Sequence, residues 1–123
     1  NRKRMAVVPS GGKLAITDYE VIRPVGSLAA LVDCHLFTGR THQIRVHMKS
    51  IGHPLIGDPV YAAHMTARKI KDSVIRGVVS AYNNQALQAY KLGFKHPVTS
   101  EQVGFEAEIS KDINSLISII EPL

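Results

Sequence analysis

The sequence predicts an α+β fold in which an antiparallel or mixed sheet is flanked by helices. Two observations carry this prediction. Apolar and polar residues alternate in several short segments, which is typical of strands with one buried face. In other segments apolar residues recur every three or four positions behind a capping residue, as in amphipathic helices. With 123 residues, the chain is long enough for one small domain with one core.

The first half of the chain predicts two paired strands that lead into a helix. Because only a short turn separates the strands, they should pair antiparallel. Thr41 is the expected N-cap of the helix and Gly52 its C-terminal stop. The predicted elements are, in order, a basic arm over 2–4, an apolar run over Met5–Val8, strands over Lys13–Ile22 and Leu28–Phe37 with a turn at Pro24–Gly26 between them, and a helix over His42–Ser50.

This helix is expected to pack through one face and to present a basic face. At 100° per residue, Ile44, Met48 and Ile51 share the apolar side, and His42, Arg45 and Lys49 share the other side. His47 falls near the apolar side, so we expect it to be a hydrogen-bonded core histidine.

The second half is patterned less evenly. Turn residues predict an ordered loop over His53–Tyr61, and the stretch 62–84 has room for a short helix. Strands are predicted over Ala86–Phe94 and Val103–Ile109, the latter with one buried face, on either side of a turn at His96–Ser100. Ser110 should cap a final helix whose apolar stripe is Ile113, Leu116, Ile117 and Ile120.

Composition favours a polyanionic partner. Fifteen Lys and Arg face ten Asp and Glu, giving a net charge of +5 and a pI near 9.6, and each phosphate contact would release counterions. A solvated basic surface is the alternative. No apolar run approaches the roughly 20 residues of a membrane span, so no membrane partner is expected. The single cysteine, Cys34, cannot form an internal disulfide and is expected to be a buried structural thiol.

The densest polar segment is 38–47, at the strand-to-helix junction. A helix N-terminus with free N–H groups is a ready anion site, and Arg40 and Thr41 are placed to assist it. A capped helix with a solvated basic face is the bland alternative. Metal binding is not expected, because His42 and His47 lie about 140° apart around the helix and one cysteine cannot build a thiolate site.

Residues Thr38–Met48, followed by Ile51–Tyr61, closely resemble the signature of the RluA-type RNA pseudouridine synthases. Weaker similarities over 4–19 and 85–97 extend the resemblance to nearly the whole chain, with 62–84 the weakest part. The resemblance implies cofactor-free isomerisation of uridine in RNA. Large-subunit ribosomal RNA in a bacterial cytoplasm is the expected substrate, and transfer RNA is the alternative.

The family's catalytic aspartate lies in an Arg-Leu-Asp motif, which this sequence does not contain. Residues 1–123 are therefore expected to form the C-terminal half of a catalytic domain. Such a chain should be inactive by itself, because Arg45 would have no aspartate to hold, and it should tend to self-associate through apolar surface.

The resemblance also assigns site residues. Arg45 aligns with the basic partner of the catalytic aspartate, where a guanidinium would keep that carboxylate ionised. Ile44 aligns with an apolar wall of the uracil pocket. Arg40, Thr41, His42 and Gln43 are candidates for supporting the RNA backbone or the active site, and local capping of the strand-to-helix turn is the alternative for His42 and Gln43. Asp58, beside Pro59, is assigned to a structural loop.

Two other readings stay open at this point. A non-catalytic RNA-binding module would explain the charge but not the long signature. A metal-dependent hydrolase is a weaker candidate and predicts bound zinc.

Overall fold

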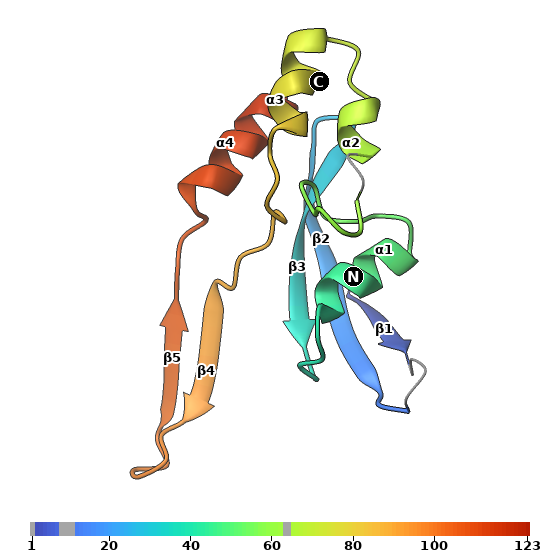
Figure 1. Cartoon of the computed structure of the whole chain (residues 1–123). Helices are drawn as coiled ribbons and strands as arrows, with labels where there is room; N and C mark the ends of the chain where they lie inside the picture. The colour runs from blue at the N-terminus through green and yellow to red at the C-terminus, as the bar shows by residue number, and fades with distance from the viewer. Residues whose placement is uncertain (1, 8–11, 63–64) are drawn as a thin grey trace.

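The α+β class is confirmed in a computed structural model that describes residues 2–7, 12–62 and 65–123 (Figure 1). The described elements are β1 (Lys3–Val7), β2 (Ala15–Val25), β3 (Ala29–Leu36), α1 (Gln43–Ser50), α2 (Met65–Arg68), α3 (Ser73–Ser80), β4 (Lys91–Lys95), β5 (Gln102–Glu106) and α4 (Lys111–Ile120). None of the helices in these ranges has the length and apolar character needed to cross a bilayer.

β1, β2 and β3 form an antiparallel sheet with β2 in the centre. β1 pairs only with the first part of β2, from Lys3 opposite Tyr19 to Val7 opposite Ala15. β3 runs along most of β2, from Ala29 opposite Val25 to Leu36 opposite Thr17. The predicted antiparallel pairing of the two long strands is therefore confirmed. The third strand, β1, takes in Lys3 and Arg4 of the predicted basic arm and Met5–Val7 of the apolar run, whose last residue, Val8, lies outside the described residues.

β2 extends three residues beyond its predicted end at Ile22. Its register with β3 shifts between Val21 and Arg23. Pro24 is tolerated in the strand because β1 does not reach this end of β2, so only one neighbour needs hydrogen bonds there. The turn then falls at Gly26, with φ 60°, where a Cβ would lie 2.6 Å from the backbone oxygen of Ile120.

α1 lies across one end of the sheet and is bound to it by polar contacts. Gln43, His47 and Met48 are its buried residues, whereas Ile51 is 37% exposed. The predicted apolar face is thus wrong in part. The reason is that Thr17, fully buried on β2, offers a hydroxyl beneath the helix, and Nδ1 of His47 lies 2.8 Å from it. His47 as a hydrogen-bonded core residue is confirmed.

The hydrophobic core lies at the opposite end of the sheet, beside the β2–β3 turn (Figure 1). α4 carries Leu116, Ile117 and Ile120 of the predicted apolar stripe into it. Ser110 accepts a hydrogen bond from the backbone of Ile113 at 3.3 Å, as an N-cap does. Ser27 of the turn donates its backbone N–H to Leu123, which anchors the C-terminal segment. The buried core residues are Val25, Ala67, Ile70, Val79, Leu116 and Ile120.

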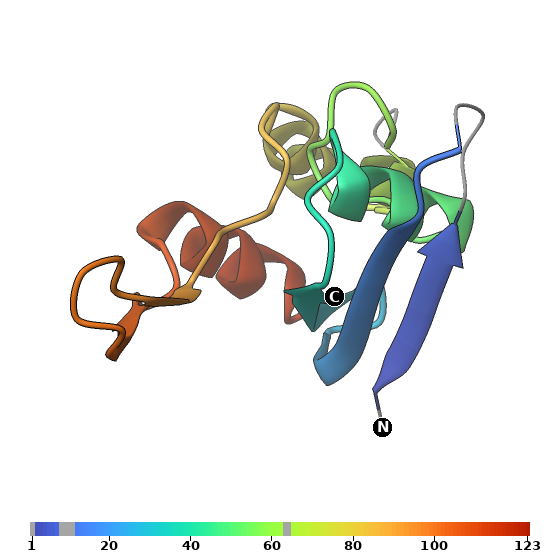
Figure 2. The ribbon, with the colours of Figure 1, turned by 90° about the horizontal axis from the view of Figure 1, so that it is seen from below.

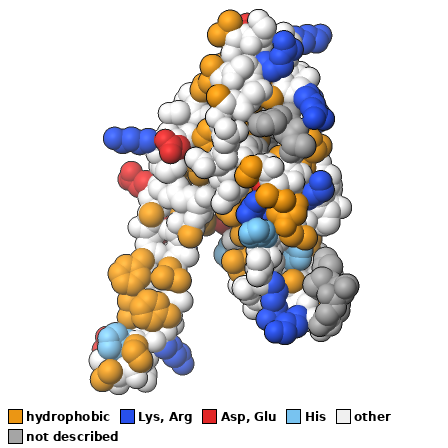
Figure 3. All heavy atoms as spheres, viewed as in Figure 1, with side chains coloured by type: hydrophobic (Ala, Val, Ile, Leu, Met, Phe, Trp, Pro, Cys, Tyr) orange, Lys and Arg blue, Asp and Glu red, His pale blue; other side chains and the backbone are white. Residues whose placement is uncertain are grey.

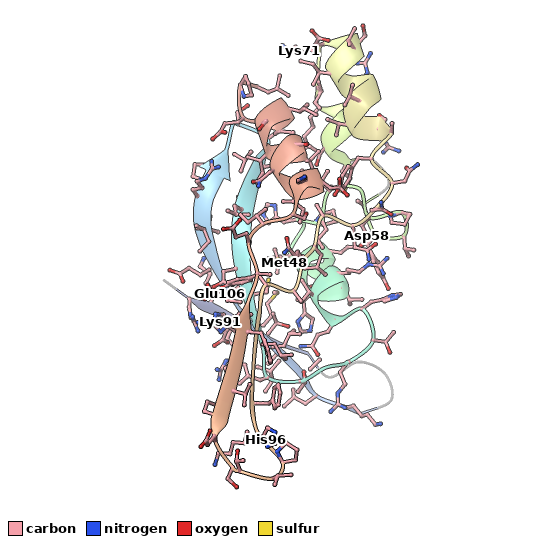
Figure 4. The ribbon with its side chains drawn as sticks, turned by 90° about the vertical axis from the view of Figure 1, so that its left-hand side faces the viewer. Met48, Asp58, Lys71, Lys91, His96 and Glu106 are labelled. Carbon is pink, nitrogen blue, oxygen red and sulfur yellow. The ribbon has the colours of Figure 1, made fainter. Side chains whose placement is uncertain are left out.

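β4 and β5 form a hairpin that extends away from the rest of the molecule, with the turn that holds His96 at its tip (Figures 1 and 4). Seen from below, the hairpin and α4 lie to one side of the three-stranded sheet (Figure 2). Both strands are shorter than predicted, and the buried face expected for Val103–Ile109 is wrong: Phe105 is 60% exposed. No described element covers this face, because the hairpin projects beyond the body.

Acid should destabilise the fold through His47. Burial lowers the pKa of this histidine below its ordinary value of 6.5. Below about pH 6.5, His47 therefore binds a proton more readily in the unfolded chain than in the folded chain. The free energy of unfolding should fall as the pH falls from about 7 to 5. Thermal melting followed by circular dichroism would measure this. His47→Gln should flatten the dependence, whereas His53→Gln, at an exposed position, should preserve it.

Candidate functional site

The site begins at the junction between β3 and α1. His42 is the N-cap residue of α1, in the left-handed conformation with φ 51° and ψ 27°, and it makes no side-chain cap. The predicted N-cap, Thr41, is therefore wrong. The backbone N–H of Gln43 donates to the oxygen of Arg40 at 3.2 Å, so the chain enters the helix through a tight turn instead.

The Gln43 side chain holds this turn to the sheet. Its Oε1 accepts hydrogen bonds from the Thr38 hydroxyl at 2.6 Å and from the backbone N–H of Arg40 at 3.0 Å. Its Nε2 donates to the Ile16 carbonyl and the Thr17 hydroxyl, both at 2.9 Å. Gln43 is buried, so its hydrogen-bonding capacity is directed to the protein, and this geometry gives it a supporting position in the site.

Arg45 is paired within this chain. Its Nε donates to Oδ2 of Asp58 at 2.7 Å and its Nη2 to Oδ1 at 2.9 Å, in a two-pronged geometry. Figure 4 shows Asp58 in the loop that follows α1. The aspartate that Arg45 holds within these residues is Asp58, which the sequence assigned only to a structural loop. Arg45 points from α1 toward the loop that follows the helix. Helical periodicity could not reveal its contact with Asp58, because it says nothing of where that loop runs.

The charged state of Asp58 is strongly favoured. The Arg45 guanidinium, helped by the backbone N–H groups of Tyr61 and Val60, lowers the pKa of Asp58 to about 2, although burial acts in the opposite direction. The same pair raises the pKa of Arg45. Both side chains are therefore ionised at any pH at which the protein would work.

Tyr61 completes the cluster; it lies within the signature Ile51–Tyr61, but the sequence analysis assigned it no role in the site. Its ring centroid lies 5.2 Å from the Arg45 guanidinium carbon, within the range of a cation–π contact. Its hydroxyl lies 3.3 Å from Nδ1 of His42, and Lys49 donates to its backbone oxygen at 3.2 Å. The loop after α1 thus returns to the predicted basic face of the helix and brings His42, Arg45 and Lys49 into contact with one tyrosine.

The remaining predicted residues lie around this cluster. Arg40, Thr41 and His42 are exposed, and Nε of Arg40 donates to the Leu14 carbonyl at 3.3 Å. Ile44 is half-buried and adjoins Arg45 in the chain. The junction therefore offers exposed basic groups next to a fixed guanidinium, an arrangement that can bind an anion.

The geometry gives little support to a nucleophilic role for Cys34 or to a metal site among the described residues. Burial, followed by the charge of Asp33, raises the pKa of Cys34 to about 11, so the thiol is protonated near neutral pH and poorly nucleophilic. Among the described residues, no group of three His, Cys, Asp or Glu side chains could hold a metal ion.

Comparison with known proteins shows first which class of proteins the chain resembles, namely the RNA-modifying enzymes. A family model described as RNA pseudouridylate synthase matches residues 1–50. Ribosomal large subunit pseudouridine synthase D of Zymomonas mobilis is 46% identical over 98% of this chain, and the protein of the same name from Neisseria meningitidis serogroup A is 48% identical over 98%. An uncharacterized RNA pseudouridine synthase of Bacillus subtilis is 45% identical over 94%.

Within that class the resemblance seen in the sequence is confirmed: over nearly its whole length, the chain is homologous to the RNA pseudouridine synthases. It spans about a third of the length of these relatives, between 31% and 36%.

Replacing Gln43 with Leu should destabilise the fold by about 2–4 kcal/mol, because groups on two segments, β2 and the loop before α1, would lose their hydrogen-bond partner. Urea unfolding of the two proteins would measure the difference. Gln85→Leu is the matched control, since Gln85 is exposed and its side chain makes no hydrogen bond in the described part of the chain. Equal effects of the two substitutions would contradict the proposed role of Gln43.

Proposed function

We propose that this chain is part of an enzyme that isomerises uridine to pseudouridine in RNA, with large-subunit ribosomal RNA of a bacterial cytoplasm as the substrate. The observation that carries this proposal is the identity of 46–48% over 98% of the chain to relatives named for that activity. The net charge of +5 and the exposed basic residues at the β3–α1 junction are compatible with an RNA partner.

In the proposed enzyme the catalytic carboxylate comes from outside residues 1–123. Arg45 would hold it ionised, since a guanidinium offers five N–H donors and Asp58 uses only two of them. Ile44, next in the chain, would form an apolar wall for a uracil removed from its stack. Arg40, Thr41, His42 and Gln43 would support the RNA backbone or the turn that presents it.

We also propose that residues 1–123 form one half of a catalytic domain and need further surface to cover them. Opposite residues of an antiparallel pair share a face, so Leu92, Phe94, Val103 and Phe105 lie together on the hairpin. Figure 3 shows hydrophobic side chains gathered along it. Leu92 is 61% exposed, and in the sheet Val21 and Leu36 are each more than half exposed. A two-stranded hairpin without such cover is marginally stable.

The function is tested on the complete gene product and on residues 1–123, each incubated with ribosomal and transfer RNA and assayed for pseudouridine by mass spectrometry. We expect conversion of ribosomal RNA by the complete protein alone. Arg45→Ala in that protein should lower the rate about a hundredfold or more, the effect of removing a preorganised charge from a dry site. Arg68→Ala, at an exposed position, should leave the rate unchanged.

RNA binding without pseudouridine formation by the complete protein would overturn the enzyme proposal and favour the non-catalytic RNA-binding module. Conversion of transfer RNA alone would overturn the substrate assignment. A melting curve for Arg45→Ala would separate loss of fold from loss of chemistry.

Residues 1–123 alone should self-associate through the hairpin face. Light scattering at increasing concentration should show a growing mean mass, and Phe105→Ser with Leu92→Ser should reduce it. Lys91→Ser with Glu106→Ser changes an opposed pair on the other face of the hairpin and is the matched control. A sharp monomer with a cooperative melt would contradict this prediction.

A further inference from the structure

Asp58 makes more contacts than a turn residue needs. Its Oδ1 accepts hydrogen bonds from the backbone N–H groups of Val60 and Tyr61 at 2.9 and 3.0 Å, as an aspartate at the start of a turn commonly does. The two bonds from Arg45 come in addition. The Asp58 side chain has no exposed surface, and an isolated carboxylate at such a position would be costly. The pairing with Arg45 therefore stabilises the charged form of the Asp58 carboxylate.

The pair also fixes the orientation of the guanidinium. Asp58 occupies the Nε–Nη2 edge, and the Tyr61 ring lies against the guanidinium at 5.2 Å. An arginine side chain is otherwise one of the most mobile in a protein, and ordering it costs conformational entropy. Here Asp58 holds one edge of the guanidinium, the guanidinium carbon lies over the Tyr61 ring, and the side chain is only 11% exposed.

The contacts with Asp58 also determine the direction of the unbonded Nη1 edge of the guanidinium. In the part of the chain that the structure describes, Nη1 of Arg45 makes no hydrogen bond, so both of its N–H donors remain for an outside acceptor. Because the guanidinium is planar, the direction of these donors follows from the edge that Asp58 holds. The loop residue thus sets the direction in which Arg45 can bind an anion.

We propose that Asp58 is a positioning residue: it orients Arg45 so that the Nη1 edge receives an oxyanion of the reacting complex, either a carboxylate of the enzyme or a phosphate of the RNA. This inference rests on the proposed function and deepens it. Asp58 does not touch the substrate. It acts through Arg45, so its removal slows the reaction, and where the oxyanion is an RNA phosphate its removal also weakens RNA binding.

The test is a double-mutant cycle in the complete protein, with single-turnover pseudouridine formation and RNA affinity measured for wild type, Asp58→Asn, Arg45→Gln and the double variant. Asparagine keeps an oxygen that can accept the hydrogen bonds from the backbone N–H groups of Val60 and Tyr61. It removes the negative charge that pairs with Arg45. We expect Asp58→Asn to slow the single-turnover rate at saturating protein at least tenfold. The RNA dissociation constant should change less than threefold where the oxyanion is a carboxylate and should rise further where it is a phosphate. In the Arg45→Gln background the same substitution should have no further effect on the rate.

Equal slowing by Asp58→Asn in both backgrounds would overturn the proposal, because Asp58 would then act through the fold of the loop. An unchanged rate would overturn it as well. If Asp58→Asn fails to fold by circular dichroism, Asp58→Ser replaces it, since a serine hydroxyl can also accept the turn N–H groups. Absence of pseudouridine from the wild-type reaction would instead contradict the proposed function, so the two failures are distinguishable.

The oxyanion is identified separately. Wild-type and Asp58→Asn proteins are compared for RNA affinity across a salt series. A shallower salt dependence in Asp58→Asn indicates a phosphate at the Nη1 edge. An identical dependence with a reduced rate indicates a carboxylate of the enzyme.

Discussion

The Arg45–Asp58 ion pair constrains the rest of the site. Asp58 has no exposed surface, and Arg45 is 11% exposed. Two charges removed from water in this way are tolerated when their geometry is good and their remaining capacity is satisfied. The loop after α1 must therefore return to the helix at Asp58, and its backbone N–H groups at 60 and 61 must turn inward. Tyr61 follows from this path and comes to lie against Arg45.

Glycines allow the close approaches that this arrangement requires. Gly57, immediately before Asp58, has φ 78°, and a Cβ there would collide with the backbone oxygen of Asn84. The loop is thus pressed against the segment that follows α3, and the Ile56 carbonyl accepts the backbone N–H of Ala86 at 2.9 Å. Any larger residue at position 57 would move Asp58 and with it the orientation of Arg45.

Local patterns were sufficient to predict much of the fold. The strand over Leu28–Phe37, the helix over His42–Ser50 and the cap at Ser110 follow from alternation, periodicity and capping chemistry, which are properties of neighbouring residues. The contact between Arg45 and Asp58 crosses 13 positions, and that between His47 and Thr17 crosses 30. Such pairings depend on how elements pack. For the same reason the hairpin was misjudged: alternation in Val103–Ile109 identifies an apolar face but does not reveal what covers it.

Packing and chemistry are divided between the two ends of the sheet. The apolar core gathers where α2, α3 and α4 meet the β2–β3 turn, whereas α1 is fixed by hydrogen bonds from Gln43 and His47 and by one ion pair. Hydrophobic contact is non-directional, but hydrogen bonds and bidentate ion pairs specify angles as well as distances. The polar end therefore fixes the direction of a guanidinium more sharply than a core could, and it depends more strongly on each single partner. A site whose task is to hold one charge in one direction is suited to this kind of support.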